Sequence, residues 1–287
     1  MDGIVNIWKP KGLTSHDVVA RIRRATGTRR VGHTGTLDPM AEGVLPVCIG
    51  KATHAVDYVV AARKTYVCTL RLGQTTDTED ATGTVTEEKP VLCGEAEIGR
   101  ALAAMEGECD QIPPMYSAVH HGGKRLYMLA RQGITVERKP RHVTFYRILL
   151  HQIQIPYVTF SVECSKGAYI RTLCKDIGEK LSCGAHMTAL TRTASGRFTE
   201  ENAVSLADFE GAPEQYLLPT SLVFSHLPSV SVTEEDEKRI RNGVSIQNPY
   251  KKEGEYAVFS ADGTLLCVSR GEEHENTHRL KMITSFY

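Results

Sequence analysis

The stretch 29-RRVGHTGTLDPMAEGVLPVCIGKATH-54 decides how the rest of the chain can be interpreted. It sets Asp38 between Leu37 and Pro39, with a histidine and two threonines close by. A proline biases the preceding residue toward extended backbone, and the three glycines of the stretch supply flexible or positive-φ positions. We therefore expect a stiff, exposed loop that holds out the carboxylate of Asp38.

Two interpretations of this loop are open. Gly, Thr, Asp and Pro are ordinary turn residues, so the segment can be a plain connection between a helix and the apolar strand at 44–49. Alternatively, Asp38 is a nucleophile or general base on an RNA-facing loop, with Arg29 and Arg30 holding phosphates. The loop by itself does not decide between them.

Composition bounds the class of protein. The 287 residues suit one large domain, or a main domain with a small appendage, and 41% hydrophobic with 24% charged residues is ordinary for a soluble globular protein. No apolar run approaches a bilayer span and the first residues lack a signal-peptide layout, so we expect a cytoplasmic protein. Eight cysteines without a C-x-x-C pair indicate reduced thiols, and we expect no metal.

The net charge of zero hides a segregated distribution. Residues 1–31 hold seven Lys and Arg against two Asp, and residues 119–147 hold seven against one Glu. The stretch 77–110 is acidic and compensates. Basic segments of this kind favour a surface for a polyanion, although two well-solvated faces explain them equally well.

Hydrophobic patterning predicts an α+β fold with long antiparallel strands. We expect strands over 4–8, 64–72, 143–155, 157–164 and 189–198. Helices are expected between the Thr14–Asp17 capping box and Gly27, over 52–60 and 95–105, near 126–130 and within 165–184. No G-x-G-x-x-G or P-loop occurs, so no nucleotide cofactor is expected.

The chain divides into two predicted units. From about residue 202 to 229 the pattern loses its period, and we expect a packed linker that completes a main domain of residues 1–229. Residues 230–287 form a second unit with a capped helix and a hairpin that turns on Asp262-Gly263. About sixty residues of short strands are typical of an accessory binding module.

Five stretches together resemble one family. They are KPKGLTSHDVV (9–19), RRVGHTGTLDPMAEGVLPVCIGKAT (29–53), KTYVCTLRLGQTTDTEDATG (64–83), QIPPMYSAVHHGGKRLYMLARQG (111–133) and SKGAYIRTLCKDIG (165–178). In this order they resemble the TruB family of tRNA pseudouridine synthases of bacterial type. The resemblance implies a mixed, largely antiparallel sheet in a catalytic domain of the pseudouridine synthase type, and a small β-rich PUA-like domain at the C-terminus.

The resemblance also implies an activity, which is isomerisation of uridine to pseudouridine at position 55 in the T loop of tRNA. It implies base flipping, no metal or cofactor, no protein partner and no membrane, and we expect a monomer. Asp38 matches the catalytic aspartate, which either adds to the uracil ring or assists loss of the base at the sugar. Arg171 matches the arginine that pairs with this aspartate, Tyr66 a tyrosine against the uracil ring that can accept a proton, and Lys9 a lysine near the pocket.

Further residues match the family's substrate contacts. Tyr169 is implied to contact the flipped base, Leu190 to form an apolar wall, and His33 to fill the space that the extruded nucleotides leave, while Arg29 and Arg30 are expected to hold the backbone. Two positions depart from the family pattern, namely Thr191, where an arginine is more usual, and His54, where a lysine is usual. Both departures are expected to weaken tRNA binding.

Two other functions compete with this interpretation. An RNA-binding or RNA-folding protein that holds the tRNA elbow without chemistry would use the same basic segments and the same C-terminal unit. A hydrolase with Asp38 as general base is the third possibility. It is disfavoured because no second catalytic carboxylate or Ser/His pair stands nearby in the sequence.

Overall fold

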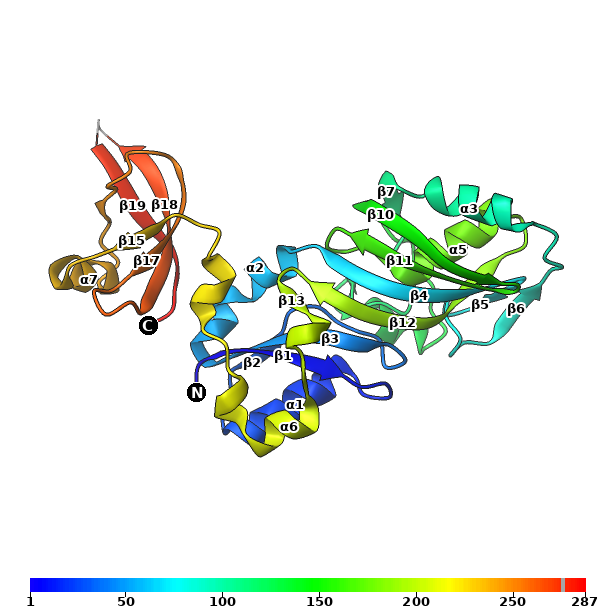
Figure 1. The fold of residues 1–287 in the computed structure, drawn as a ribbon, viewed down its shortest axis with the longest axis horizontal. Helices are drawn as coiled ribbons and strands as arrows, with labels where there is room; N and C mark the ends of the chain where they lie inside the picture. Colours follow the sequence, from blue (N-terminus) through cyan, green and yellow to red (C-terminus); the bar gives the residue numbers. More distant parts are fainter. Residues whose placement is uncertain (275–276) are drawn as a thin grey trace.

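A computed structural model describes residues 1–274 and 277–287, and its main body is built on one ten-stranded sheet (Figure 1). The strand order is β14-β1-β3-β12-β4-β11-β10-β7, with β2 paired to β3 and β13 to β12. The strands are β1 (Gly3–Lys9), β2 (Val31–His33), β3 (Glu42–Ile49), β4 (Lys64–Leu72), β7 (Gly107–Gln111), β10 (Arg141–Gln154), β11 (Tyr157–Cys164), β12 (Ala185–Ser195), β13 (Phe198–Thr199) and β14 (Val204–Ser205). Among the described strand pairs of this sheet, only β1–β14 and β3–β12 are parallel, which confirms a mixed, largely antiparallel sheet.

Helices lie on both faces of this sheet. One face shares its core with α1 (Ser15–Thr26), α3 (Glu95–Ala103), α5 (Ile170–Lys180) and α6 (Leu206–Gly211). The 3-10 turn Gly50–Ala55 and α2 (Val56–Ala61) pack on the opposite face. Strand β3 serves both cores, because alternate side chains of a strand point to opposite faces: Leu45 and Val47 enter the first core, Val44 and Cys48 the second.

Local sequence signals explain the elements that position the site. The predicted capping box forms at Thr14 and Asp17, and Gly27 ends α1 in the left-handed conformation at φ 63°. Along β4 every second side chain, from Lys64 to Leu72, is buried, as the alternating pattern predicts, and this turns Tyr66 inward. The long pair β10–β11 and helix α5 also lie where the sequence predicts them.

Two expectations need correction. The strand predicted at 189–198, the last of the main domain, is β12: it begins at Ala185, ends at Ser195 and lies inside the sheet between β3 and β4, because hydrophobic periodicity does not specify neighbours. The predicted helix over 52–60 begins as a 3-10 turn. The segment expected to be a packed linker contains short elements that pack on the main body: β14 pairs with β1, and Glu210 of α6 forms an ion pair with Arg21 of α1.

The C-terminal β-rich domain has its own five-stranded sheet and core. The strand order is β15 (Ser229–Ser231), β17 (Gly254–Phe259), β18 (Leu265–His274), β19 (Thr277–Ser285) and β16 (Ile246–Gln247), accompanied by α7 (Glu234–Arg241). As predicted, β17 and β18 form a hairpin that turns at Asp262-Gly263. An aromatic cluster joins this sheet to the body, because Phe224 packs between Tyr58 of α2 and Phe286.

Short elements complete the chain. These are β5 (Gln74–Thr76), β6 (Val85–Glu88), β8 (His120–His121), β9 (Lys124–Arg125), α4 (Leu126–Ala130) and 3-10 turns at Glu200–Asn202, Pro213–Tyr216 and Thr220–Phe224. Within residues 1–274 and 277–287, no helix is both long and apolar enough to cross a membrane.

Two helical glycines give opposite predictions for the same substitution. A Cβ on Gly178 of α5 would lie 2.2 Å from the backbone nitrogen of Ala185, whereas a Cβ on Gly99 of α3 would meet no atom within 4 Å. We expect Gly178→Ala to lower the free energy of unfolding by about 1–3 kcal/mol, because α5 must move away from β12. Gly99→Ala should raise it by about 0.5–1 kcal/mol, because alanine is the better helix former. Urea unfolding of the two variants measures the change in the free energy of unfolding for each. A Gly178→Ala variant that is more stable than the wild type would contradict the close packing of α5 on β12.

Candidate active site

Asp38 lies in the loop 34–41, which joins β2 to β3 as a hairpin, so the short strand β2 replaces the direct helix-to-strand connection considered from sequence. The loop is braced on both sides of Asp38. The Ser15 hydroxyl of α1 accepts a hydrogen bond from the Leu37 N–H (2.9 Å) and donates one to the Leu37 carbonyl (3.2 Å). The Gly12 N–H donates to the Pro39 carbonyl (2.7 Å). The predicted stiffness therefore has an external cause, in α1 and in the turn before it.

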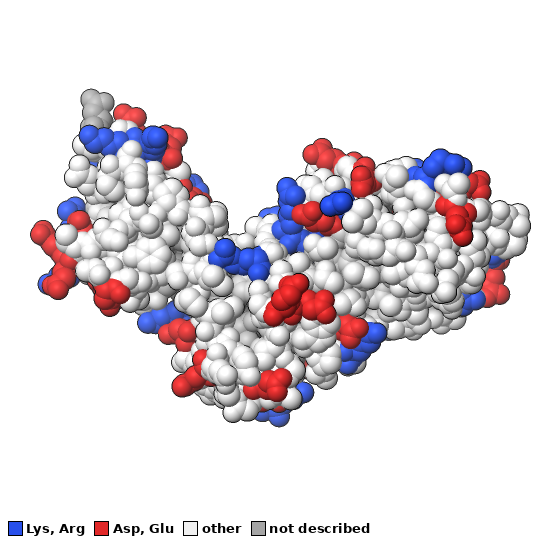
Figure 2. All heavy atoms as spheres, viewed as in Figure 1, with Lys and Arg blue, Asp and Glu red and all other residues white. Residues whose placement is uncertain are grey.

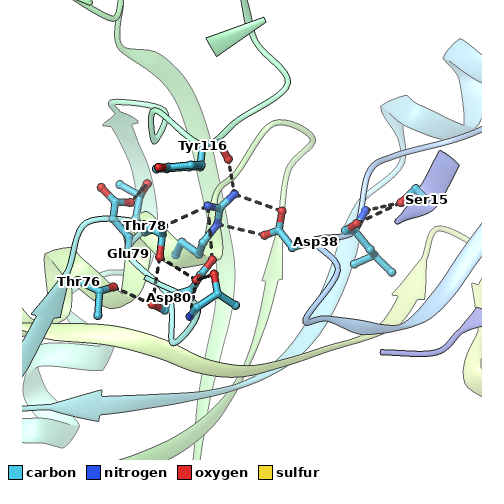
Figure 3. A network of polar contacts seen from close by, with 11 residues as sticks. Ser15, Asp38, Thr76, Thr78, Glu79, Asp80 and Tyr116 are labelled. Carbon is cyan, nitrogen blue, oxygen red and sulfur yellow. Dashed lines mark hydrogen bonds and ion pairs between the residues drawn. The ribbon is translucent and has the colours of Figure 1, made fainter. Parts of the chain in front are cut away.

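The carboxylate of Asp38 is not held out into solvent, which corrects the expectation of an exposed group. Its side chain is 30% exposed and faces Arg171, the second residue of α5 (Figure 3). The Nε of Arg171 lies 3.1 Å from Oδ2 of Asp38, and a second guanidinium nitrogen donates to Oδ1 at 3.3 Å. A guanidinium that holds both carboxylate oxygens fixes the plane of the carboxylate as well as its position.

Arg171 is itself held on several sides, and its side chain is only 7% exposed. It donates to the carbonyl oxygens of Tyr116 (2.8 Å) and Thr78 (3.3 Å). A second carboxylate, that of Asp80, also faces the guanidinium, with its Oδ2 3.6 Å away, and Asp80 is 4% exposed (Figure 3). The guanidinium cannot turn away from Asp38 without breaking these contacts.

Burial and charge act in opposite directions on the Asp38 carboxyl. Desolvation is the larger effect and leaves the pKa of Asp38 raised above its usual value, while the positive charge of Arg171 opposes the rise. Burial also lowers the pKa of Lys9 to about 8, while the charge of Asp38 opposes that shift. The ammonium of Lys9 donates to the carbonyls of Pro10 (2.9 Å) and Leu13 (2.7 Å), so Lys9 holds the turn that braces the Asp38 loop.

Tyr66 and Leu190 lie on neighbouring strands beside this pair. Both are largely buried, Tyr66 on β4 and Leu190 on β12, where Arg192 is the residue opposite Tyr66 in the strand register. Burial raises the pKa of Tyr66, and the nearby charge of Arg192 opposes the rise. The resting phenol is therefore protonated at neutral pH, and it can act as a proton acceptor only after it has lost its own proton.

Tyr169 stands at the N-cap of α5, two residues before Arg171. Its backbone is clamped by the buried side chain of Gln111, which accepts from the Tyr169 N–H (2.9 Å) and donates to the Tyr169 carbonyl (3.2 Å). Burial raises the pKa of its phenol as well, so the ring is neutral at physiological pH. The clamp fixes the start of α5 and hence the direction of Arg171.

His33 lines a cavity of about 340 Å³ between α1, β2 and the segment around Arg125. Its ring meets that of His16 edge to face, with centroids 5.3 Å apart, and burial lowers the pKa of His33 to about 4. A neutral imidazole therefore fills this place at pH 7. Arg29 and Arg30 are exposed directly before β2, so their guanidinium groups are open to a ligand.

Several residues of the site were not singled out from the sequence. Arg192 is 1% exposed and donates to the carbonyl of Gly35 (3.1 Å), near the start of the Asp38 loop, and to that of Val44 (2.7 Å) in β3, just beyond the loop. Asp80 and Gln111 were also missed as site residues, although both lie in stretches that carry the resemblance. A polar residue inside a motif, flanked by turn residues, was the signal available for Asp80. Among the residues that the structure describes, no group of three or more His, Cys, Asp or Glu is arranged to hold a metal.

The two departures from the family pattern lie away from the carboxylate. Thr191 donates to Glu42 at 3.5 Å, and Glu42 lies 3.4 Å from Lys11. His54 lies against the C-terminal domain, with Nδ1 2.6 Å from the Ser285 carbonyl. The structure therefore gives His54 a role in joining the two parts of the chain.

Comparisons with known proteins agree on one family. The model for the N-terminal domain of the TruB family of pseudouridylate synthases matches residues 23–170, and that for the C-terminal domain of tRNA pseudouridylate synthase B matches residues 171–220. A tRNA pseudouridine synthase B of Clostridium kluyveri is 46% identical over 86% of both chains. One from Oceanobacillus iheyensis is 43% identical over 100% of this chain and 98% of its own.

Solved structures show the same fold. A Cbf5-Nop10-Gar1 complex contains a chain that is 28% identical, with a TM-score of 0.74 over 99% of this chain and 85% of that chain. An H/ACA RNP bound to a substrate RNA containing 2'-deoxyuridine gives the same TM-score at 25% identity, with the same coverage of both chains. With the paired Asp38 and Arg171 in a sheet of this topology, and with relatives this similar over nearly the whole length, the chain belongs to the TruB family of pseudouridine synthases.

Proposed function

We propose that this protein isomerises uridine to pseudouridine at position 55 in the T loop of tRNA, with Asp38 as its catalytic residue. The observation that carries the proposal is the two-point contact of Arg171 on the half-buried Asp38 carboxylate. The relatives reported above, named tRNA pseudouridine synthase B, support the substrate.

The reaction rearranges one nucleotide and needs no co-substrate. The bond from C1′ of the ribose to N1 of uracil breaks, a bond from C1′ to C5 forms, C5 loses a proton and N1 gains one. Asp38 serves either as the nucleophile that adds to the ring or as the group that assists loss of the base at the sugar. Both routes need an ionised carboxylate, and the charge of Arg171 favours that form.

The uracil has to leave the base stack before it can reach Asp38. We propose that Tyr66 lies against the flipped ring, that Leu190 forms an apolar wall, and that Tyr169 contacts the base at the start of α5. The neutral His33 is suited to fill the space left in the stack, since an uncharged ring can pack between bases without losing ion hydration. In this proposal one carboxylate carries out the chemical step, while aromatic rings and an apolar side chain recognise the flipped base.

The basic surface is suited to the RNA backbone. Arg29 and Arg30 are exposed beside the Asp38 loop. Figure 2 shows Lys and Arg side chains beside the notch between the body and the C-terminal domain, although acidic side chains lie among them. Phosphate contacts of this kind supply sequence-independent affinity and orient the substrate.

We further propose that residues 1–229 act as the catalytic domain and residues 230–287 as a PUA-like RNA-binding module. Support comes from the separate hydrophobic core of the second unit and from the exposed cations Arg279 and Lys281 on β19. A cytoplasmic location belongs to this proposal, because all eight cysteines are free thiols, which suit a reducing compartment.

Asp38→Asn tests the chemistry. The amide has nearly the shape of the carboxylate but cannot act as a nucleophile or carry the charge, so pseudouridine formation on an unmodified tRNA transcript should fall below detection. The Kd for tRNA should change by less than about tenfold, which corresponds to 1.4 kcal/mol. Product is mapped by position along the transcript, and Asp57→Asn on the exposed face of α2 is the matched control. A wild-type protein that binds tRNA but forms no pseudouridine would leave only the RNA-binding function.

Arg171→Lys tests the electrostatics of the pair. Product formation should fall as pH falls through the pKa of Asp38, because protonation removes the active carboxylate. The arginine charge lowers that pKa, and a lysine holds its charge less closely. The acid limb of the pH–rate profile should therefore move to higher pH, while Arg63→Lys in the exposed pair with Glu163 leaves it in place. An unmoved acid limb would show that Arg171 does not set the ionisation of Asp38.

Arg279→Ala and Lys281→Ala test the role of the C-terminal module. Each change should weaken the Kd for tRNA and reduce the slope of log Kd against log salt by about one for each lost phosphate contact. The rate at saturating tRNA should stay the same, since neither residue lies in the body that carries Asp38. Lys89→Ala, which removes a cation paired with Glu87 at 2.9 Å, is the control. Equal losses in rate and affinity would refute an accessory role.

A further inference from the structure

The loop 77–82 between β5 and β6 holds Arg171 from the side opposite Asp38 (Figure 3). It contributes the Thr78 carbonyl, which accepts from Arg171 at 3.3 Å, and the Asp80 carboxylate at 3.6 Å. Oδ1 of Asp80 is engaged within the loop by the Thr78 hydroxyl (2.8 Å) and the Thr82 N–H (2.9 Å). This leaves Oδ2 to face the guanidinium, so the placing of the loop decides how Arg171 is held.

Glu79 lies at the centre of this loop in an unfavourable backbone conformation. Its φ of 63° is in the left-handed region, a backbone conformation that residues other than glycine and asparagine seldom adopt. The conformation lets the carbonyl of Glu79 accept from the Met187 N–H of β12 at 3.1 Å, while the preceding and following residues face Arg171. The loop keeps this backbone conformation because its contacts outweigh the steric cost of the left-handed φ at Glu79.

The side chain of Glu79 supplies such a contact, and it reaches the helix that carries Arg171. Its Oε2 accepts from the hydroxyl of Thr172 at 3.0 Å, and its Oε1 lies 3.8 Å from Nζ of Lys175. The Glu79 side chain is 15% exposed and Thr172 is buried, so water screens this contact weakly. Thr172 is the neighbour of Arg171, and Lys175 stands one helical turn beyond it.

We propose that Glu79 is a positioning residue for the reaction: its carboxylate clasps the loop 77–82 to α5 and thereby keeps Arg171 directed at Asp38. The inference rests on the proposed function, because its consequence is a change in the rate of pseudouridine formation. Glu79 touches neither Asp38 nor the place where the base is proposed to lie. It acts only through Thr78, Asp80 and the guanidinium.

The test separates the side chain of Glu79 from its backbone. Glu79→Gly suits a φ of 63° without strain and removes the clasp, and Thr172→Val removes the donor of the clasp with little change in shape. Each variant should lower the single-turnover rate at saturating tRNA by about tenfold, because small errors in aligning a catalytic group are costly. The Kd for tRNA should stay close to that of the wild type, while Thr172→Val, which keeps the strained backbone of Glu79 but loses its contact, should unfold at a lower temperature than Glu79→Gly. Glu179→Gln removes the other carboxylate near Lys175, 3.6 Å away and 62% exposed, and should leave the rate unchanged.

A double-mutant cycle distinguishes positioning from general damage. In the Arg171→Lys background, Glu79→Gly should have little further effect, because the clasp works through the arginine. Equal rate losses in both backgrounds, or a wild-type rate in Glu79→Gly and Thr172→Val, would overturn the inference while the proposed function stands. A wild-type protein without pseudouridine product would instead refute the proposed function, and the inference with it.

Discussion

The ion pair between Asp38 and Arg171 is the constraint on which the rest of the site depends. Moving a carboxylate and a guanidinium out of water is costly, and their attraction offsets that cost only when the remaining donors and acceptors are also satisfied. Arg171 meets this condition with the carbonyls of Tyr116 and Thr78 and with a second carboxylate, Asp80. The pair is stable in its buried place because the protein surrounds it with oxygen atoms.

Those oxygen atoms come from segments far apart in the chain, and this explains the extent of the supporting structure. The Asp38 loop is pinned by Ser15 and Gly12 on one side and by Arg192 on the other, while α5 is clamped at its start by Gln111. The ten-stranded sheet brings these segments together. Strands β3, β12 and β4 are adjacent in the sheet, although in the chain they are spread over residues 42–195. A local change in any one segment is therefore transmitted to the carboxylate.

Sequence patterns predicted the elements whose signals are local. Capping and periodicity predict α1, β4 and α5, and the resemblance pairs Asp38 with Arg171, as the structure does. The place of β12 inside the sheet, the burial of the Asp38 carboxylate and the part of Asp80 were not predictable, because each depends on which distant segments become neighbours. His54 shows the same limit: its departure from the family pattern predicted weaker tRNA binding, but its contact with a carbonyl 231 residues away could not be predicted from the sequence.

The arginines of the site illustrate why net charge says little about function. Arg171 and Arg192 are almost fully buried, and their guanidinium groups are occupied by carboxylates and carbonyls of the protein itself. Arg29 and Arg30 are exposed and available to a polyanion. The N–H donors of a buried guanidinium bond to protein oxygens and align the catalytic group, whereas those of an exposed guanidinium are available to the substrate. The same residue type therefore serves two purposes, and burial decides which one. The alignment exists before any base arrives, and the energy of RNA binding is then free to be used in drawing the uridine out of its stack.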